Sequence, residues 1–173
     1  MSAKPDSIRI AGVVRESIVD GPGIRFVVFA QGCPHRCAGC HNEATHDFSG
    51  GHEYETDKIM AEIEKNPLLS GVTFSGGEPF CQPEGFFSLA VKLKRRGMNI
   101  LSFTGYTYEE LECLKEGNES IGGLLANIDI LIDGRFVLEK RDLTLQFKGS
   151  SNQRYIDMNA TRAAERLVEV EKL

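Results

Sequence analysis

Three of the five cysteines in this chain fall within eight residues of one another, at Cys33, Cys37 and Cys40. A small and odd number of cysteines does not suit a disulfide scaffold, and a reducing compartment keeps such thiols free. All four histidines lie in the same stretch or just after it: His35, His41, His46 and His52. This clustering of rare residue types predicts a chemically active loop, which the surrounding fold has to hold in place.

The apolar pattern predicts strands that alternate with helices along the chain. The expected strands cover residues 24–29, 71–74, 99–103, 129–132 and 143–147. The expected helices cover residues 56–66, 83–96, 107–115 and 159–171, and Thr107 and Glu110 have the spacing of a capping box. Alternation of this kind requires crossover connections and gives a mainly parallel sheet. A complete eight-unit barrel takes about 250 residues, so we expect this chain of 173 residues to form an open, partial TIM-type (β/α) barrel of the α/β class, as one domain over residues 1–173.

Cysteine and polar residues follow the expected strands at the points where those strands end. Cys33 comes after the first strand and Glu78 after the second, while Thr104 and Asp133 follow the next two. Parallel α/β folds bind their ligands at the carboxyl edge of the sheet. We therefore expect these side chains to meet along one edge, which is the active edge of the molecule.

The composition disfavours several classes of protein. The formal net charge is −5, which argues against a nucleic-acid-binding domain because such domains carry a basic stripe. No apolar run approaches the roughly 18 residues that span a bilayer, and the first residues lack the apolar segment of a secretory signal. We expect a soluble, cytoplasmic protein that binds neither nucleic acid nor membrane.

The spacing of the cysteine loop is C-x3-C-x2-C. Three thiolates on one short loop can each bind one iron of a [4Fe–4S] cubane, and without a fourth cysteine in the loop the last iron is open to another ligand. Gly32 and Gly39 would let the backbone wrap closely around such a core. A structural zinc site, completed by His41 or His46, is the alternative. It is less favoured because zinc ligands usually come as two separated pairs.

The same spacing is typical of the radical S-adenosylmethionine (SAM) superfamily, and four further segments resemble its glycyl-radical-enzyme activases. These segments are DGPGIR at 20–25, SGGEP at 75–79, TGY at 104–106 and GSSNQR at 149–154. The resemblance runs in order over residues 15–157. It implies the partial barrel of the radical SAM enzymes, with a [4Fe–4S] cluster and SAM as cofactors.

The resemblance also implies roles for individual residues. Cys33, Cys37 and Cys40 would be the metal ligands. The residues that would contact SAM are Gly39, Cys40, His41, Gly76, Gly77, Glu78, Thr104 and Asp133. Glu78 would meet its ammonium group, whereas Thr104 and Asp133 would hold ribose hydroxyls or a cation, unless they only cap turns. Many members carry an aromatic residue directly before the third cysteine. This chain has Gly39 there, as is common in the subgroup of activases whose partner is an anaerobic ribonucleotide reductase.

The reaction that the resemblance implies is reductive cleavage of SAM, followed by hydrogen abstraction from a glycine of a large glycyl-radical enzyme, with no protein acid or base. Asp20, Gly21, Pro22, Gly23 and Arg25 would form the loop that meets this partner, although DGPG also fits an ordinary turn. The short length and the GSSNQR segment resemble most the subgroup whose partner is anaerobic ribonucleotide reductase. The expected one-electron donor is a flavodoxin or a ferredoxin.

Other interpretations stay open at this point. An activase of pyruvate formate-lyase shares the chemistry and the DGPGIR loop but usually has a longer chain. A radical SAM enzyme acting on a small molecule, such as one that forms a deazapurine, is a more distant alternative. A zinc-stabilised binding module without catalysis belongs to a different class.

Asn152 and Arg154 would anchor the last strand or face SAM or the partner, and Cys81 and Cys113 are expected to be small buried side chains.

Overall fold

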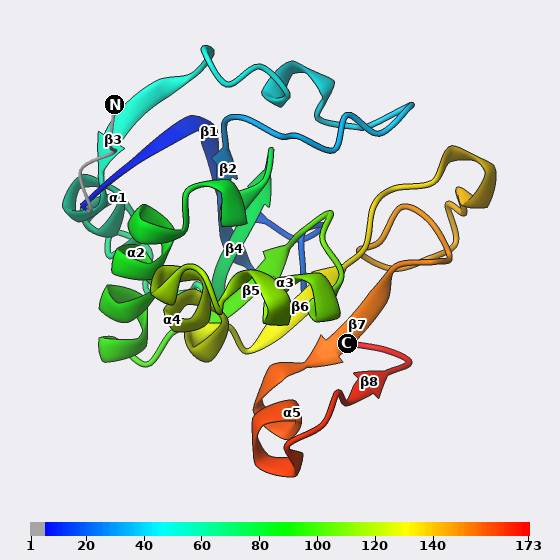
Figure 1. Ribbon diagram of the computed structural model, residues 1–173. Coiled ribbons are helices and arrows are strands. Elements are labelled where there is room, and N and C mark those ends of the chain that lie inside the picture. Colours follow the sequence, from blue (N-terminus) through cyan, green and yellow to red (C-terminus); the bar gives the residue numbers. More distant parts are fainter. Residues whose placement is uncertain (1–5) are drawn as a thin grey trace.

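The computed structural model describes residues 6–173. Eight strands in this part of the chain form one mixed sheet (Figure 1). The order across the sheet is β3-β1-β2-β4-β5-β6-β7-β8. The strands are β1 (Ser7–Ser17), β2 (Arg25–Ala30), β3 (His52–Glu55), β4 (Gly71–Gly76), β5 (Asn99–Phe103), β6 (Ile130–Asp133), β7 (Arg154–Asp157) and β8 (Glu169–Val170). The helices are α1 (Thr56–Ile63), α2 (Pro83–Arg95), α3 (Tyr108–Leu114), α4 (Glu119–Asn127) and α5 (Met158–Ala164). The domain expected over residues 1–173 includes residues 1–5, which lie outside the described part of the chain.

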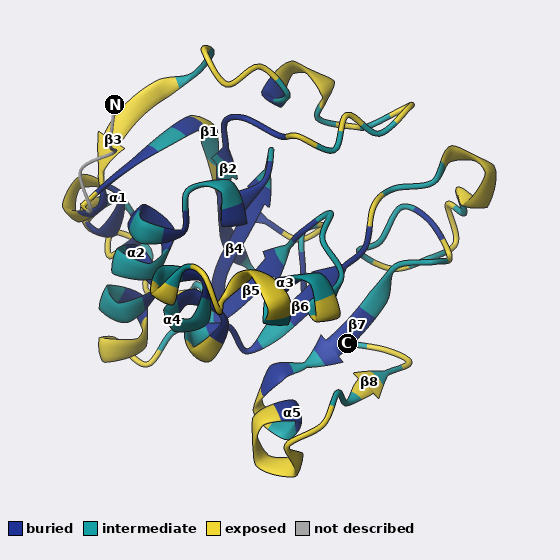
Figure 2. Cartoon of the chain, in the orientation of Figure 1, coloured by how far each residue is buried: buried dark blue, intermediate teal, exposed yellow. Residues whose placement is uncertain are grey.

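The four central strands form the parallel part of the sheet. β2, β4, β5 and β6 pair in parallel with their neighbours, whereas β1 and β3 on one side and β7 and β8 on the other pair antiparallel. The central strands are buried along most of their length (Figure 2), as is typical of parallel strands covered on both faces. The predicted α/β class, with an open sheet and a parallel core, is confirmed.

Alternating side chains divide the core into two layers. Ile100 and Leu131 belong to the larger apolar cluster, to which the helices also contribute. Their sequence neighbours Leu101 and Ile132 belong to a second, smaller cluster. Successive residues of a strand point to opposite faces of the sheet, so the two clusters lie on opposite faces of β5 and β6. Apolar side chains thus pack against β5 and β6 on both faces of the sheet.

Most predicted elements are confirmed, with shifts of a few residues at their ends. The first four expected strands correspond to β2, β4, β5 and β6, and the first three expected helices to α1, α2 and α3. The capping box of α3 is present, because the Thr107 hydroxyl accepts the Glu110 N–H and the Glu110 carboxylate accepts the Thr107 N–H. Sequence analysis missed α4 and the flanking strands β1, β3, β7 and β8. None of the described helices is long and apolar enough to cross a membrane.

Two predictions near the C-terminus were wrong. Residues 143–147 form turns instead of a strand, because the Asp142 carboxylate accepts hydrogen bonds from both the amide and the hydroxyl of Thr144. Side-chain bonds of this kind compete with regular backbone pairing. The helix expected over residues 159–171 is limited to the short α5, since Glu165 has a left-handed φ of 51°. The chain then returns as β8 and pairs with β7.

Candidate functional site

Loops at the carboxyl ends of the parallel strands surround a cavity of about 560 Å³. This volume lies within the roughly 300–1,000 Å³ typical of small-molecule sites. The predicted site residues that line the cavity are Asp20, Cys33, Cys37, Cys40, His41, Gly76, Gly77 and Thr104. Residues far apart in the sequence therefore face one space, at the edge of the sheet where ligands of parallel α/β folds bind.

The cysteine loop is fixed at its base by backbone hydrogen bonds. The N–H groups of Gly32 and Cys33 donate to the carbonyl oxygens of Thr45 and His46 at 2.8 and 3.2 Å. Between the second and third cysteines the chain turns at Gly39, whose φ of +71° favours glycine over any residue with a side chain. The loop can therefore present all three cysteines to the same cavity.

The three cysteine side chains suit a polynuclear cluster better than a single zinc ion. Cys33 is buried, Cys37 and Cys40 are half-buried, and burial raises the pKa of the Cys33 and Cys40 thiols above the ordinary value. Zinc requires four ligands around one point, whereas a cubane binds each thiolate on a different iron. The donor set thus fits a [4Fe–4S] cluster.

Gly76 and Gly77 bring the end of β4 against the end of β2. A Cβ at Gly76 would lie 2.7 Å from the backbone of Ala30, and a Cβ at Gly77 would lie 2.4 Å from the carbonyl oxygen of Gly32. No side chain fits at either distance. The N–H groups of Gly77 and Glu78 donate to the carbonyls of Ala30 and Gly32, both at 2.8 Å. The two glycines thus leave bare backbone next to the cysteine loop.

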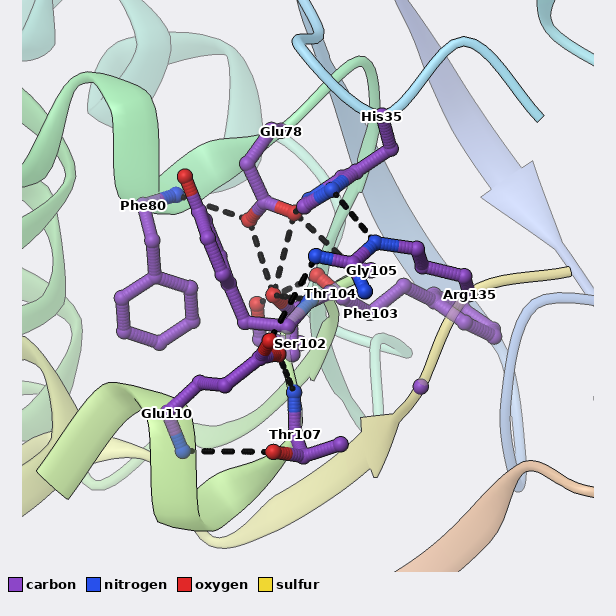
Figure 3. Close-up of polar contacts among 12 residues, drawn as sticks. His35, Glu78, Phe80, Ser102, Phe103, Thr104, Gly105, Thr107, Glu110 and Arg135 are labelled. Atoms are coloured by element: carbon purple, nitrogen blue, oxygen red, sulfur yellow. Dashed lines mark hydrogen bonds and ion pairs between the residues drawn. The ribbon is translucent and has the colours of Figure 1, made fainter.

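Glu78 is fully buried, and its carboxylate meets donors from three loops (Figure 3). Oε1 accepts the Phe80 N–H at 3.1 Å and lies 2.9 Å from the Thr104 hydroxyl. Oε2 accepts the Gly105 N–H at 2.8 Å and lies 2.8 Å from His35 Nε2. Glu78 does not belong to the cavity lining. Its contact with the ammonium group of SAM stays a prediction, and the contacts in the structure join the loops to one another.

Asp133 lies behind the cavity wall in an ion pair. Its carboxylate is 1% exposed, accepts the Tyr108 N–H at 2.7 Å and binds the Arg154 guanidinium, with Nε at 3.0 Å. Arg154 also bonds to Glu109 through two nitrogens, at 3.1 and 2.7 Å, and these hydrogen bonds to the two acids raise the pKa of Arg154. Asp133 and Arg154 are register partners in β6 and β7. Arg154 therefore anchors the strand, while the contact of Asp133 with ribose stays a prediction.

The first part of the DGPG segment reaches the mouth of the cavity. Asp20 lines the cavity, and its carboxylate accepts the Ser17 hydroxyl at 2.5 Å. Gly21 is buried, Pro22 is half-buried and Gly23 is exposed. The accessible part of this segment is thus limited to Asp20, Pro22 and Gly23.

Arg25 differs from its expected placement at a partner surface. The side chain is 1% exposed, and its guanidinium donates to the Thr73 hydroxyl at 2.7 Å and to the Val72 carbonyl at 2.8 Å. Burial lowers the pKa of Arg25 to about 10. A Cβ at Gly21 would lie 2.6 Å from Arg25 Cδ. Arg25 therefore fills the space beneath the DGPG segment and supports it from inside.

The cavity wall includes side chains to which the sequence assigned no individual role in the site. They are His35, Phe29, Phe103, Phe136, Phe147, Lys148 and Gln153. Phe136 lies against the cysteine loop, because a Cβ at Gly39 would be 3.6 Å from its ring. The loop after β6 thus brings an aromatic ring next to the position where this chain has glycine. Phe29 and Phe103 lie at the ends of expected strands, and this position could have identified them as cavity-lining residues. The sequence around Phe136 and Lys148 gives no such indication.

Three other residues considered from the sequence lie outside the cavity lining. Cys81 is half-buried and Cys113 is exposed, so the expectation of a buried side chain was wrong for Cys113. The side chain of Asn152 donates to the carbonyl oxygen of Arg135 at 2.9 Å. This hydrogen bond joins the two ends of the loop between β6 and β7, so Asn152 stabilises the conformation of that loop.

Comparison with known protein families identifies the class of protein to which this chain belongs. The 4Fe-4S single cluster domain family matches residues 19–156, a range that contains the cysteine loop, both glycines after β4 and the loop between β6 and β7. A crystal structure of QueE from Escherichia coli shares 18% sequence identity at a TM-score of 0.47, over 58% of this chain and 54% of that chain. The class defined by the family match and the site is an iron–sulfur domain on an open α/β sheet.

Curated relatives narrow this class. The anaerobic ribonucleoside-triphosphate reductase-activating protein of Vibrio cholerae is 37% identical over 145 residues, which cover 79% of this chain and 89% of that protein. The pyruvate formate-lyase-activating enzyme of Clostridium pasteurianum is 38% identical over 110 residues, covering 60% of this chain and 46% of that enzyme. The chain belongs to the family of anaerobic ribonucleoside-triphosphate reductase-activating proteins, which are radical SAM enzymes. The predicted enzyme class and the predicted cofactors, a [4Fe–4S] cluster and SAM, are confirmed, and the zinc-stabilised module is excluded.

Proposed function

We propose that this enzyme cleaves SAM reductively and generates a radical on a glycine of an anaerobic ribonucleotide reductase. The observation that carries the proposal is that Cys33, Cys37 and Cys40 share one cavity with the bare backbone of Gly76 and Gly77. The alignment with the Vibrio cholerae protein over 79% of the chain supports the choice of partner. The reductase is thus the first partner to test.

The chemistry of SAM cleavage belongs to the cofactor, and the protein supplies binding and orientation. When bound, the cluster would supply the electron for reductive cleavage of SAM, and this chemistry would lead to hydrogen abstraction from the partner's glycine. Cys33, Cys37 and Cys40 would each bind one iron. No side chain of the site has to act as an acid or base in this reaction.

The residues around the cysteines would bind and enclose SAM. Gly76 and Gly77 and, across the cysteine loop, Cys40 and His41 line the cavity, and their backbone groups, with that of Gly39, would contact the amino acid part and the adenine. Thr104, directly after β5, lines the cavity, and its hydroxyl would contact the ribose. The rings of Phe29 and Phe103 in the lining would exclude water from the reacting atoms. Glu78 and Asp133 would support this arrangement from behind, in addition to their predicted contacts.

The partner's glycine segment would enter at the mouth formed by the DGPG segment. Asp20 lines the cavity there, and its carboxylate can accept backbone amides of an extended chain. Ile18 and Val19, directly before it, are 74% and 71% exposed and would add apolar contact area at this mouth. A flavodoxin or ferredoxin would supply the electron at another face.

The test is a glycyl-radical signal in electron paramagnetic resonance. The reconstituted enzyme is mixed without air with SAM, a strong reductant and a purified anaerobic ribonucleotide reductase, and the sample is frozen. The proposal expects a glycyl doublet on the reductase that depends on SAM and is absent with a Gly→Ala variant of the reductase. Production of 5′-deoxyadenosine without any signal on the reductase would contradict the choice of partner.

A second candidate partner is pyruvate formate-lyase. It is favoured by the 38% identity to the Clostridium pasteurianum activating enzyme, although this chain covers only 46% of that enzyme. The same experiment with the lyase in place of the reductase separates the two. A signal on the lyase alone would transfer the proposal to that partner.

A further inference from the structure

His35 lies inside the cysteine loop, between the first and second cysteines, and its imidazole is held by two other loops (Figure 3). Nε2 lies 2.8 Å from Glu78 Oε2, and Arg135 Nε donates to Nδ1 at 3.2 Å. The side chains of His35 and Glu78 are 4% and 0% exposed. The ring also packs edge-on against Tyr106, with 4.5 Å between the ring centroids. Both ring nitrogens are therefore used inside the protein.

These contacts assign the position of the ring proton. A guanidinium can donate but cannot accept, so Nδ1 accepts from Arg135, and Nε2 carries the proton that it donates to Glu78. The same Glu78 carboxylate accepts from Thr104 and Gly105 at the end of β5. Arg135, which follows β6, lies 3.4 Å from the Glu110 carboxylate of the α3 capping box. One hydrogen-bonded chain thus connects the cysteine loop with the loops after β4, β5 and β6.

The ring of His35 rests directly on the backbone at Gly105. A Cβ at Gly105 would lie 2.3 Å from Cδ2 of the His35 ring, so glycine is required for the ring to rest on the chain after β5. A buried carboxylate such as Glu78 is costly unless its oxygens are bonded. The observed position of the His35 ring satisfies an oxygen of Glu78 and ties the segment between the first two cysteines to the loops after β4, β5 and β6.

We propose that His35 is a positioning residue that locks the cysteine loop in one orientation relative to the bare backbone of Gly76 and Gly77. The proposal rests on the proposed function in one respect, since the cysteines would hold the cluster and the two glycines would hold part of SAM. His35 acts through the loop and has no role in the reaction itself. The consequence is that the three cysteines are held in one position relative to the backbone of Gly76 and Gly77. Groups that orient metal ligands from outside typically change affinity or activity by about 10–100-fold when they are removed.

The test compares His35→Leu with His35→Gln. Leucine fills much of the space but has no donor, whereas a glutamine amide can place a donor near the position of Nε2. The first readout is hydrogen exchange of residues 31–42 in the metal-free protein. The second is the KM for SAM and the turnover rate at saturating SAM, both followed in the reconstituted enzyme by the release of 5′-deoxyadenosine. His52→Leu is the matched control, because His52 is exposed in the edge strand β3, far along the sheet order from β5 and β6.

We expect His35→Leu to raise exchange in residues 31–42 and to raise the KM for SAM about tenfold, with a smaller change in the turnover rate. His35→Gln is expected to restore most of both, and His52→Leu to match the wild type. Equal behaviour of the two His35 variants, at whatever level, would show that the hydrogen bond is not the cause and would overturn the proposal. If His35→Leu does not fold, Arg135→Leu replaces it, since that side chain is 51% exposed. Wild-type exchange and KM in Arg135→Leu would then overturn the proposal, and a rise in both would support it.

The two readouts also separate this inference from the proposed function. Exchange in the metal-free chain depends on neither cluster nor SAM. If the wild type binds no cluster or cleaves no SAM, the proposed function fails while the exchange comparison still decides whether His35 fixes the loop. If the wild type cleaves SAM and the His35 variants match it in exchange and KM, only the inference fails.

Discussion

Two loops face each other across the cavity, and they are held in different ways. The cysteine loop is bonded to the body of the protein, because the carbonyl of Gly32 accepts from Glu78 and the side chain of Gln31 donates to the carbonyl of Asp47 at 2.6 Å. The loop over residues 134–153 is bonded mainly to itself and extends beyond β6 and β7 (Figure 1). Leu143 at its far end is 81% exposed. The wall carrying the cysteines is therefore set by the sheet, whereas most of the opposite wall depends on contacts within one loop, and Arg135 links that loop to His35 and Glu110.

The largest effect is expected from Cys37→Ala, which removes one of the three thiolates of the first wall. Two thiolates on the loop cannot hold a cubane in the way three do, so the variant is expected to retain little iron after anoxic reconstitution. Cys113→Ala is the matched control, because Cys113 is exposed and lies outside the cavity lining. Iron and sulfide analysis of both variants measures the effect. Wild-type iron content in Cys37→Ala would contradict the assignment.

The next effect is expected from Gly77→Ala, which tests the close approach between β4 and β2. The added Cβ would lie 2.4 Å from the Gly32 carbonyl oxygen, a backbone atom that cannot move without moving the cysteine loop. Overpacking of this kind costs about 1–3 kcal/mol, to be measured as free energy of unfolding in urea. Gly12→Ala in β1 has no atom within 4 Å of its added Cβ and should stay within about 0.5 kcal/mol of the wild type. Equal stability of the two variants would show that the approach is not tight.

A smaller and local effect is expected from Gln153→Ala in the opposite wall. Gln153 accepts from the amides of Gly149 and Ser150 at 2.9 and 3.2 Å, and donates to the Gly134 carbonyl at 2.9 Å. Each such bond contributes about 0.5–1.5 kcal/mol net. We expect faster hydrogen exchange over residues 136–153, a much smaller change in residues 31–47 because Arg135 keeps its bonds to His35 and Glu110, and no change in the control Gln146→Ala. A change of equal size in the cysteine loop would mean that the two walls are coupled beyond the contact between Arg135 and His35.

The smallest effect is a dependence of stability on pH that arises away from both loops, before β6. Burial alone would raise the pKa of Asp129, but bonds from Lys94, the Ile100 N–H and Asn159 outweigh it and hold the pKa below its usual value. A depressed carboxyl pKa contributes stability above the unfolded-state pKa of about 3.9, and this is lost as pH falls through the folded-state value. Urea unfolding between neutral and acid pH should therefore show a smaller loss of stability in Asp129→Asn than in the wild type. An identical pH profile in both would refute the contribution of Asp129.

The sequence predicts best what depends on local patterns. The strands that lead to Cys33, Glu78, Thr104 and Asp133 are short apolar runs, and the cysteine spacing identifies the loop without any tertiary information. The placement of charged side chains depends on partners that are distant in the sequence. Arg25 has a loop motif around it, yet it is buried because Thr73 and Val72 on a neighbouring strand supply acceptors. That pairing depends on the parallel register of β2 and β4, which local patterns do not specify.

The same limit explains what was missed in the site. His35 bonds to Glu78, 43 residues away, and to Arg135, 100 residues away. Nothing near His35 in the sequence indicates either contact. Phe136 reaches Gly39 from a loop whose apolar residues resemble a strand at 143–147, whereas side-chain bonds around Asp142 turn the chain instead. Long-range polar contacts and polar turns are therefore the parts that required the structure.

The central claim is that the cysteine loop holds a cluster that cleaves SAM beside the backbone of Gly76 and Gly77. The most direct test is SAM turnover under anoxic conditions, with reconstituted enzyme, a strong one-electron reductant and detection of 5′-deoxyadenosine. The account predicts product from the wild type and from Cys113→Ala, and none from Cys37→Ala. Absence of product from a wild-type enzyme that carries its full complement of iron and sulfide, or equal product from Cys37→Ala, would contradict it.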